Sequence, residues 1–282
     1  MRITTLIENK AGSTDKHLAS EWGLSLHITF NGHEILFDTG ASGLFAKNAE
    51  RLSVNVASVE AMVLSHHHFD HGGGLRRFLE LNSKAKVYLG ERPDGDCTGR
   101  LLWFMKKYIG LDNDLFKTYS DRFTFVHEPA QILPDVFVFP HILNTHPRPG
   151  GNKRLFLRRD GKLVPDDFSH EMVMAIKENG KLVVFTGCSH SGILNMVDTV
   201  AKEFIGVPIK AVIGGFHLVA SPLFNAMAGS AREVEDLGKS VLNYPVDVTY
   251  TGHCTGTKAI GVLKGVMGER LREIRTGSSF EV

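Results

Sequence analysis

Short apolar runs and stretches of helical periodicity alternate along the chain. Two of the runs, 24–30 and 33–37, flank Asn31-Gly32, a dipeptide typical of a type I′ hairpin turn between strands. Alternating or continuous apolar positions predict further strands over 2–8, 61–64, 86–89, 182–185, 209–213 and 246–250. Apolar positions three and four residues apart predict helices over about 42–52, 75–81, 193–204 and 229–242. This order of strands and helices is typical of a layered α/β fold.

A second group of strands and a less regular segment complete the outline. Residues 123–126 and 136–139 predict strands of a second sheet, which we expect 269–282 to close. The periodicity loosens over about 91–122, where 101–105 carries a dense apolar and aromatic run. This run is either part of a cap insertion over the mouth of a site or a core helix. We therefore expect a single domain over all 282 residues, with a cap insertion at about 91–122.

Composition narrows the partners that the protein is expected to have. The formal net charge is +1, with 22% charged and 43% hydrophobic residues, which is ordinary for a globular protein. This balance predicts neither a nucleic acid nor an anionic membrane as partner, and no apolar run reaches the roughly 18 residues of a membrane span. The first residues lack the apolar core of a signal peptide, so we expect a cytoplasmic protein that acts on a small molecule. The sequence is also compatible with a homo-oligomer.

The three cysteines, Cys97, Cys188 and Cys254, form no Cys-x-x-Cys pair, which predicts reduced thiols. Two of them lie close in sequence to His190 and His253, which are considered below. We interpret these cysteines as small buried residues that pack beside a site rather than as ligands.

The densest chemistry lies in Ser-His-His-His-Phe-Asp-His-Gly-Gly-Gly, between the strand predicted to end at residue 64 and the following helix. His66 and His68 are two residues apart, so in extended backbone they point to the same side. Asp70 and His71 follow on the turn and can face a second point. A solvated histidine patch or a cloning tag is the alternative, but a tag lies at a terminus without flanking strand and helix. Imidazole and carboxylate at this spacing predict a metal site.

Three more histidines follow predicted strands. His190 lies in Thr-Gly-Cys-Ser-His-Ser-Gly-Ile, His217 in Gly-Gly-Phe-His-Leu, and His253 in Thr-Gly-His-Cys-Thr-Gly. With His66, His68 and His71, six of the fourteen histidines therefore lie at strand-to-loop junctions. The ends of sheet strands are where open α/β folds place their sites, so we expect one metal centre there.

The block His-x-His-x-Asp-His after a strand resembles the signature of the metallo-β-lactamase-fold superfamily. The resemblance implies a four-layer αββα sandwich, with two mixed β-sheets inside and helices outside. It implies two divalent metal ions, one bound by the first ligand set and one by the second. The first set is His66, His68 and His190, and the second is Asp70, His71 and His253. The ligand types favour zinc and leave manganese and iron as alternatives.

Two further positions matter in this resemblance. Asp38, in a strand-Asp-Thr-Gly block, corresponds to an aspartate that supports the metal loop from behind, although a cap of the helix near Ser42 fits the residue type equally well. Most members place a metal-bridging aspartate where this chain has His217, and no carboxylate lies between Glu203 and Glu233. We expect His217 to bind one metal end-on, and contact with the substrate is the alternative.

Four blocks together narrow the resemblance to one branch: Ser-His-His-His-Phe-Asp-His-Gly-Gly-Gly-Leu and the blocks around the other three junction histidines. That branch is named for 7,8-dihydropterin-6-methyl-4-(β-D-ribofuranosyl)aminobenzene 5′-phosphate synthase. The resemblance implies transfer of a pterin methyl group to an arylamine, with pyrophosphate leaving. A metallo-hydrolase (phosphodiesterase, lactonase or β-lactamase-like) and a non-enzymatic metal-binding or redox module remain alternatives.

Catalytic and substrate-binding candidates follow from position. Asp70 and His217 are the catalytic candidates, because both are expected at the metals. His146 and Arg148 lie in a basic, proline-containing loop that could meet a phosphate. Ser189 and Thr255 flank the junction histidines and complete the predicted substrate contacts.

Overall fold

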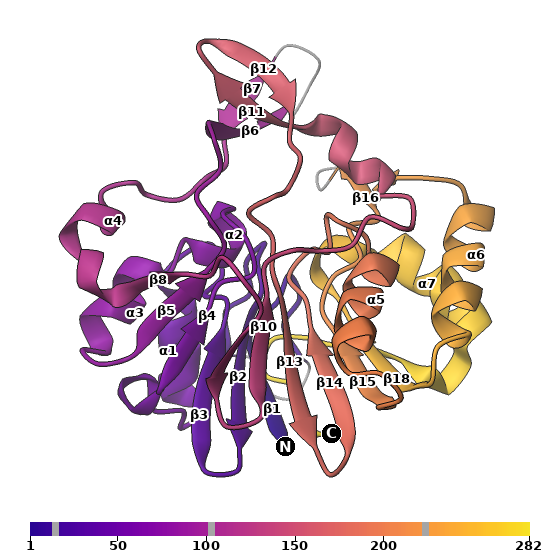
Figure 1. Cartoon of the computed structure of the whole chain (residues 1–282), viewed down its shortest axis with the longest axis horizontal. Helices are drawn as coiled ribbons and strands as arrows, with labels where there is room; N and C mark the ends of the chain where they lie inside the picture. Colours follow the sequence, from indigo (N-terminus) through magenta and orange to yellow (C-terminus); the bar gives the residue numbers. More distant parts are fainter. Residues whose placement is uncertain (13–16, 101–104, 222–225) are drawn as a thin grey trace.

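The computed structural model describes residues 1–12, 17–100, 105–221 and 226–282. Two seven-stranded sheets face each other at the centre of the molecule (Figure 1). The first runs in the order β20 (Ser279–Glu281), β1 (Arg2–Ile7), β2 (Ser25–Phe30), β3 (His33–Phe37), β4 (Ala61–Val63), β5 (Lys86–Leu89) and β8 (Phe123–Phe125). The second runs in the order β19 (Leu271–Glu273), β18 (Val246–Thr251), β15 (Ile209–Ile213), β14 (Lys181–Phe185), β13 (Val173–Glu178), β10 (Val136–Phe139) and β9 (Ala130–Leu133).

Helices cover the outer face of each sheet, so the predicted four-layer αββα sandwich is confirmed (Figure 1). On the first sheet these are α1 (Leu44–Arg51) and α3 (Leu75–Leu81), and on the second α5 (Ile193–Glu203), α6 (Ala231–Leu242) and α7 (Thr257–Met267). The alternation of side chains along each strand explains the layering. In β14, Val183 and Phe185 enter the core between the sheets, whereas Leu182 and Val184 pack beneath the helices.

Two strand assignments made from sequence were wrong. β8 was expected in the second sheet but pairs with β5 in the first, in parallel, with Phe123 beside Val87. The short helix α4 (Leu115–Thr118) and the 3₁₀ turn η2 (Ser120–Arg122) make the crossover that parallel pairing requires. The end of the chain was expected to close the second sheet, and only β19 does so. β20 pairs with β1 in the first sheet, where Phe280 stacks on Tyr250.

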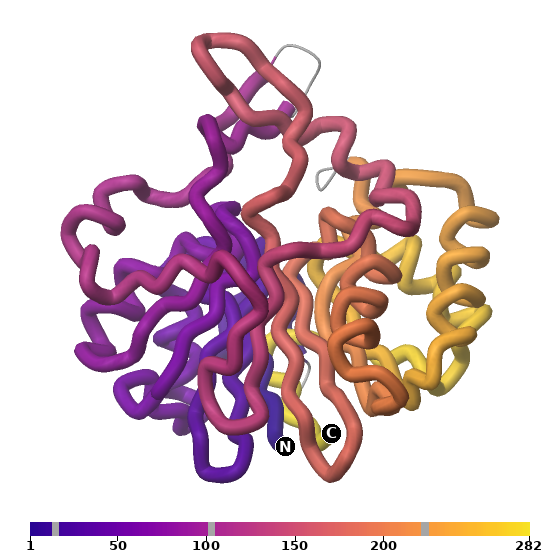
Figure 2. Tube along the Cα trace, viewed as in Figure 1, coloured from indigo at the N-terminus to yellow at the C-terminus, as the bar shows by residue number. Residues whose placement is uncertain are grey.

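A separate four-stranded sheet, here called the cap, stands beyond one end of the sandwich. It consists of β6 (Asp96–Arg100), β7 (Lys106–Tyr108), β11 (Leu155–Arg159) and β12 (Lys162–Pro165). Figure 2 shows these two distant parts of the chain side by side above the sandwich. The expected insertion over 91–122 thus supplies only half of the cap, because pairing of β6 with β11 needs the later segment. Residues 101–104, where a cap segment or core helix was predicted, lie outside the described residues.

The remaining elements are short and connect the layers. They are α2 (Phe69–Gly72), the two-stranded β16 (Val219–Ser221) and β17 (Ala226–Met227), and the 3₁₀ turns η1 (Val56–Ser58), η3 (Gly150–Arg154), η5 (His253–Thr255) and η6 (Gly268–Arg270). Among the described residues, no helix is both long and apolar enough to cross a bilayer.

The sheet topology brings the predicted site residues to one end of the sandwich. β14, β15 and β18 run parallel to one another, so the loops after them emerge at the same end. β4 in the first sheet delivers the histidine-rich loop and α2 there as well, on the side that carries the cap (Figure 1).

Candidate metal centre

Two groups of buried side chains lie next to each other beneath the cap. The ligand atoms of His66, His68 and His190 all lie within 4.8 Å of one another, as do those of Asp70, His71, His253 and Cys188. The rings of His66 and His71, one from each group, are 4.2 Å apart between centroids. The six junction residues expected to form two ligand sets are therefore together in space, from loops more than 180 residues apart in sequence.

A carboxylate behind the histidine-rich loop fixes the orientation of two imidazoles. Asp38 Oδ1 accepts the Ser65 N–H at 2.8 Å, while Oδ2 accepts the Ser65 hydroxyl at 2.8 Å and His71 Nδ1–H at 2.6 Å. Since the Ser65 hydroxyl donates to Asp38, its oxygen accepts Nδ1–H of His66 at 2.9 Å. Asp38 therefore supports the loop directly. The helix-cap alternative does not describe this contact pattern, because α1 has no side-chain cap.

Amide side chains fix two more imidazoles. His253 Nδ1–H donates to Asn9 Oδ1 at 3.0 Å, and His190 Nδ1–H donates to Asn152 Oδ1 at 3.0 Å. Buried carboxylates hold the backbone of the same two histidines. Glu8 accepts the His253 N–H at 2.5 Å, and Glu171 accepts the His190 N–H at 2.7 Å. In each case the bond at Nδ1 leaves the Nε2 lone pair directed into the site.

Several of the Nε2 atoms that point into the site have no hydrogen-bond partner. Nε2 of His66, His68 and His190 is buried without a hydrogen-bond partner. Nε2 of His71 and Nε2 of His253 lie 3.1 Å apart, and Nδ1 of each ring is already hydrogen-bonded, to Asp38 and to Asn9. Buried polar atoms without partners cost free energy. A cation bound by the Nε2 atoms of His66, His68 and His190 removes this cost, so the residues fit divalent metal ions.

The electrostatics of the two groups differ. Burial and neighbouring imidazoles lower the pKa values of His66 and His190 well below the ordinary value for histidine. The same causes lower the pKa of His68 to about 3. These rings are therefore neutral, as a metal ligand must be. Burial also lowers the pKa of His71, but the carboxylates of Asp38 and Asp70 outweigh it and raise this pKa to about 9. The same negative field attracts a cation.

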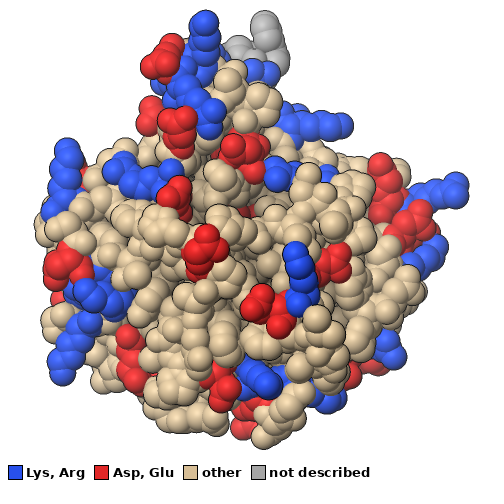
Figure 3. Space-filling view, in the orientation of Figure 1, with Lys and Arg blue, Asp and Glu red and all other residues tan. Residues whose placement is uncertain are grey.

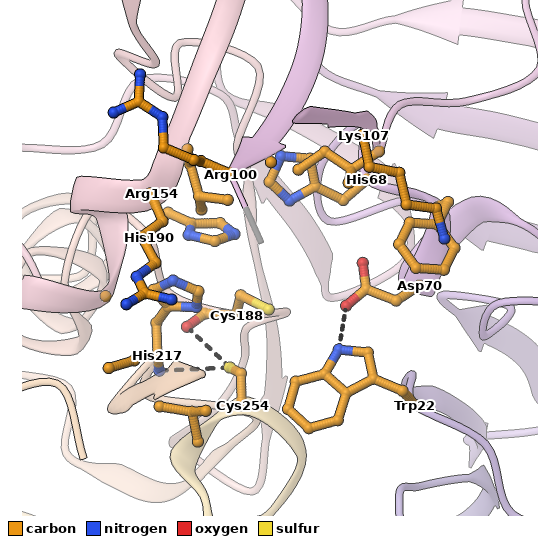
Figure 4. A pocket seen from close by; sticks show the side chains of 17 residues that line it. Trp22, His68, Asp70, Arg100, Lys107, Arg154, Cys188, His190, His217 and Cys254 are labelled. Atoms are coloured by element: carbon orange, nitrogen blue, oxygen red, sulfur yellow. Dashed lines mark hydrogen bonds between the residues drawn. The ribbon is translucent and has the colours of Figure 1, made fainter. Parts of the chain in front are cut away.

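Asp70 is positioned by a residue that the sequence did not single out. Burial raises the pKa of Asp70, but the nearby His71 and His253 outweigh it and lower this pKa below its ordinary value. Trp22 Nε1–H donates to Asp70 Oδ2 at 3.0 Å, and the indole packs 5.1 Å from the His253 ring. Figure 4 shows this bond at the edge of the pocket.

His217 lies beside the first group rather than within it. Its ring is 4.2 Å from that of His190, and its ligand atom is within 4.8 Å of those of His190 and Cys188. Its Nδ1 is buried without a hydrogen-bond partner. Gly151 packs against this ring so closely that a Cβ there would lie 2.7 Å from His217 Cδ2. His217 thus borders the metal groups and the pocket above them.

The four predicted substrate contacts are engaged elsewhere. His146 Nε2 bonds Asp198 at 3.0 Å, and the Arg148 guanidinium donates to the Asp167 carbonyl at 2.7 Å. The Ser189 hydroxyl donates to the Gly215 carbonyl at 2.7 Å, and Thr255 accepts the Phe216 N–H at 2.9 Å. None of the four lines the pocket described next. Composition predicted a phosphate contact for the loop at 144–154; His146 and Arg148 have local polar partners, whereas Arg154 of the same loop lines the pocket.

A pocket of about 340 Å³ opens over the two metal-ligand groups. Its floor is formed by His68, Asp70, Cys188, His190, His217 and Cys254. Its apolar walls include Trp22, Phe69, Ile109, Leu155 and Val219, and three basic residues complete it: Arg100 and Lys107 from the cap, and Arg154 from η3 (Figure 4). Basic side chains are also frequent on the outer surface of the cap (Figure 3).

Several residues that position the histidines of the site were not predicted from the sequence. They are Asn9, Asn152, Glu8 and Glu171, which come from distant parts of the chain, and only their position in space reveals the role. For the basic residues a weak signal existed: the insertion was expected over the mouth of the site, and Lys107 lies within it.

This fold and this cluster of histidines and aspartates define a metallo-β-lactamase-fold protein. A model of the metallo-β-lactamase superfamily matches residues 24–253, and the chain belongs to that superfamily.

Particular relatives resemble the chain over almost its whole length. The 7,8-dihydropterin-6-methyl-4-(β-D-ribofuranosyl)-aminobenzene-5′-phosphate synthase of Methanocaldococcus jannaschii is 30% identical over 299 aligned positions, covering 98% of this chain and 95% of the relative. The solved structure of Tm1679, described as a metal-dependent hydrolase of the β-lactamase superfamily, superposes with a TM-score of 0.81 and 29% identity, covering 100% and 99% of the two chains. Zn²⁺-bound PqqB from Methylobacterium extorquens shares the fold, with a TM-score of 0.57 and 11% identity over the full length of both chains.

Proposed function

We propose that the protein is a metal-dependent enzyme that holds two divalent ions, zinc by preference, and acts on a phosphate-bearing small molecule. One ion is assigned to His66, His68 and His190, and the other to Asp70, His71 and His253. The observation that carries the proposal is the pocket, in which basic and apolar side chains converge over His68, Asp70 and His190 of these six residues. Bound metals supply Lewis acidity, which neutralises charge on a phosphoryl group or activates water.

The pocket is suited to an anion joined to a ring. Arg100 and Lys107 bring positive charge from the cap, and Arg154 brings it from η3. Phosphate and pyrophosphate are recognised by such clusters. The walls beside them are apolar and aromatic, which suits a flat heterocycle such as a pterin.

The reaction class proposed is displacement of pyrophosphate from a dihydropterin by an arylamine. A carbon–nitrogen bond forms as the bond from carbon to the pyrophosphate oxygen breaks, and the electron pair leaves with pyrophosphate. The basic residues of the pocket would hold the departing anion. His217 borders the pocket with a buried nitrogen that lacks a partner, and we assign it the proton transfer that accompanies the exchange.

A hydrolase is the second candidate, because the solved structure with a TM-score of 0.81 is described as a metal-dependent hydrolase. The test incubates zinc-loaded protein with a dihydropterin pyrophosphate, with and without an arylamine bearing ribofuranosyl phosphate. Pyrophosphate release that depends on the arylamine supports the transferase. Release without it, or turnover of a generic phosphodiester, supports the hydrolase, and no turnover of either kind would refute an enzymatic role on these substrates.

Matched lysine variants test the role of the pocket. Lys107 lines the pocket with its ammonium 5.4 Å from the Phe69 ring, whereas the neighbouring Lys106 does not line it. A charge-assisted hydrogen bond is worth about 1.5–3 kcal/mol, so Lys107→Met should raise KM for the phosphate-bearing substrate roughly 10- to 100-fold. Lys106→Met should leave KM unchanged. Equal effects of the two variants would contradict the assignment.

A further inference from the structure

Cys188 occupies the space between the two metal-ligand groups. It lies in the loop after β14, two residues before His190, and only 3% of it is exposed. Its sulfur belongs to one group with Asp70, His71 and His253, and to another with His190 and His217, with all ligand atoms of a group within 4.8 Å of one another. Figure 4 shows the sulfur pointing from the side of His190 and His217 toward Asp70.

The Cys188 sulfur contacts the ring of His71. Cys188 Sγ lies 3.2 Å from His71 Nε2. Nδ1 of the same ring is hydrogen-bonded to Asp38, so Nε2 is the ring nitrogen that points into the site, and the sulfur lies beside it. Two ligands of one tetrahedral zinc ion, with bonds of about 2.1 and 2.3 Å, lie roughly 3.6 Å apart, close to this separation.

The other cysteine in the pocket has a different environment. Cys254 Sγ accepts the backbone N–H of His217 at 3.3 Å and is directed at the Cys188 carbonyl at 3.5 Å. Among the described residues it belongs to none of the groups that could hold a metal. Cys254 is 2% exposed and Cys188 is 3% exposed, so burial does not distinguish them. What separates them is the direction of the sulfur.

We propose that Cys188 is a thiolate ligand of the ion assigned to Asp70, His71 and His253. This rests on the metal centre of the proposed function and revises the expectation that both neighbouring cysteines only pack. On binding, the S–H bond breaks, a sulfur–metal bond forms, and the proton leaves to solvent. The thiolate adds one negative charge on the side that faces His190 and His217. An imidazole at residue 217 cannot supply that charge.

X-ray absorption spectroscopy of zinc-loaded protein tests the assignment without reference to activity. A sulfur neighbour at about 2.3 Å from zinc is expected in the wild-type protein and in Cys254→Ser, but not in Cys188→Ser. Cobalt-loaded samples should show the near-ultraviolet band of sulfur-to-cobalt charge transfer in the same two proteins. Absence of the sulfur signal from the wild type, or its persistence in Cys188→Ser, would overturn the proposal.

A double variant covers the case in which Cys188→Ser fails to fold. The chain has three cysteines, so Cys97→Ser combined with Cys254→Ser leaves Cys188 as the single thiol. A zinc–thiolate signal in this protein can come only from Cys188, and its loss would assign the sulfur to another cysteine and refute the proposal. Because the samples contain no substrate, failure to find the proposed activity would leave this measurement unaffected.

Discussion

Replacing Asp38 with asparagine should weaken metal binding while leaving the shape of the loop nearly unchanged. The asparagine oxygen can still accept the Ser65 N–H, as Oδ1 does in the native protein. The new amide group, however, takes the position of Oδ2 and faces two donors, the Ser65 hydroxyl and His71 Nδ1–H. The hydroxyl can rotate, but the imidazole relieves the conflict only by moving its proton to Nε2. That proton then occupies the lone pair through which His71 is proposed to bind a metal ion.

The expected losses of zinc affinity and of stability follow from the number of hydrogen bonds that each substitution changes. Loss of an outer partner of a ligand histidine typically lowers metal affinity 10- to 100-fold, or about 1.4–2.8 kcal/mol. Asp38→Ala goes further, because it leaves the Ser65 N–H and His71 Nδ1–H buried without an acceptor. At about 1–3 kcal/mol for each group, this variant should also lose roughly 2–6 kcal/mol of stability.

Competition with a zinc chelator measures the affinity, and metal analysis gives the stoichiometry. Asp247→Asn is the matched control, since Asp247 lies at the start of β18, at the opposite end of that strand from His253, and its side chain is 56% exposed. We expect the control to bind zinc as the wild type does and Asp38→Asn to bind more weakly. If Asp38→Asn and Asp247→Asn have the same zinc affinity, the hydrogen bond to Asp38 does not determine which nitrogen of His71 carries the proton.

Three further predictions follow from contacts in the site. Trp22→Phe removes the hydrogen bond to Asp70 Oδ2, so zinc affinity should fall by about tenfold, and a chelator titration that shows no change would contradict this role. Gly151→Ala forces a Cβ to within 2.7 Å of the His217 ring, so it should lower stability by about 1–3 kcal/mol in thermal unfolding. Gly265→Ala is the control, because a Cβ there would meet no atom within 4 Å, and it should not lower the stability. His71 is protonated in the metal-free protein below its pKa of about 9 and must be neutral to bind metal, so zinc affinity should rise with pH up to about 9. This pKa lies above the ordinary value of 6.5, so protonated His71 stabilises the metal-free fold. That contribution is fully present below about pH 6.5 and is lost as the pH rises through 9. Unfolding experiments on the metal-free protein across this pH range measure the loss.

The sequence predicted those features whose signal is local. Strand, loop and helix around residues 61–81 are visible as an apolar run, a ligand-rich turn and a helical period, and the structure has all three. Parallel strands place their ends at one edge, so the approach of His190 and His253 to His66 could also be anticipated.

Features that depend on distant pairing were not predictable in the same way. The apolar pattern of 123–126 indicates a strand but not its partner, and the structure pairs β8 with β5 in the first sheet. Likewise, Asn9 and Asn152 look like ordinary loop residues, yet each makes two hydrogen bonds to a histidine of the candidate metal centre, one to the ring and one to the backbone carbonyl. Within the basic loop that was predicted to meet an anion, Arg148 donates to a backbone carbonyl, whereas Arg154 lines the pocket. Binding roles of this kind depend on geometry rather than on residue type.

The pairing of β1 with β20 has a consequence for protein synthesis. Glu8 and Asn9, just after β1, hold His253, and the strand that secures β1 at the sheet edge lies at residues 279–281. Asn9 contacts a residue that lies 244 positions later in the sequence, so these hydrogen bonds can form only after His253 has left the ribosome. A metal ion held by Asp70, His71 and His253, as proposed above, could not gain its full ligand set before that point, and a nascent chain interrupted earlier would expose Asp70 and His71 without His253.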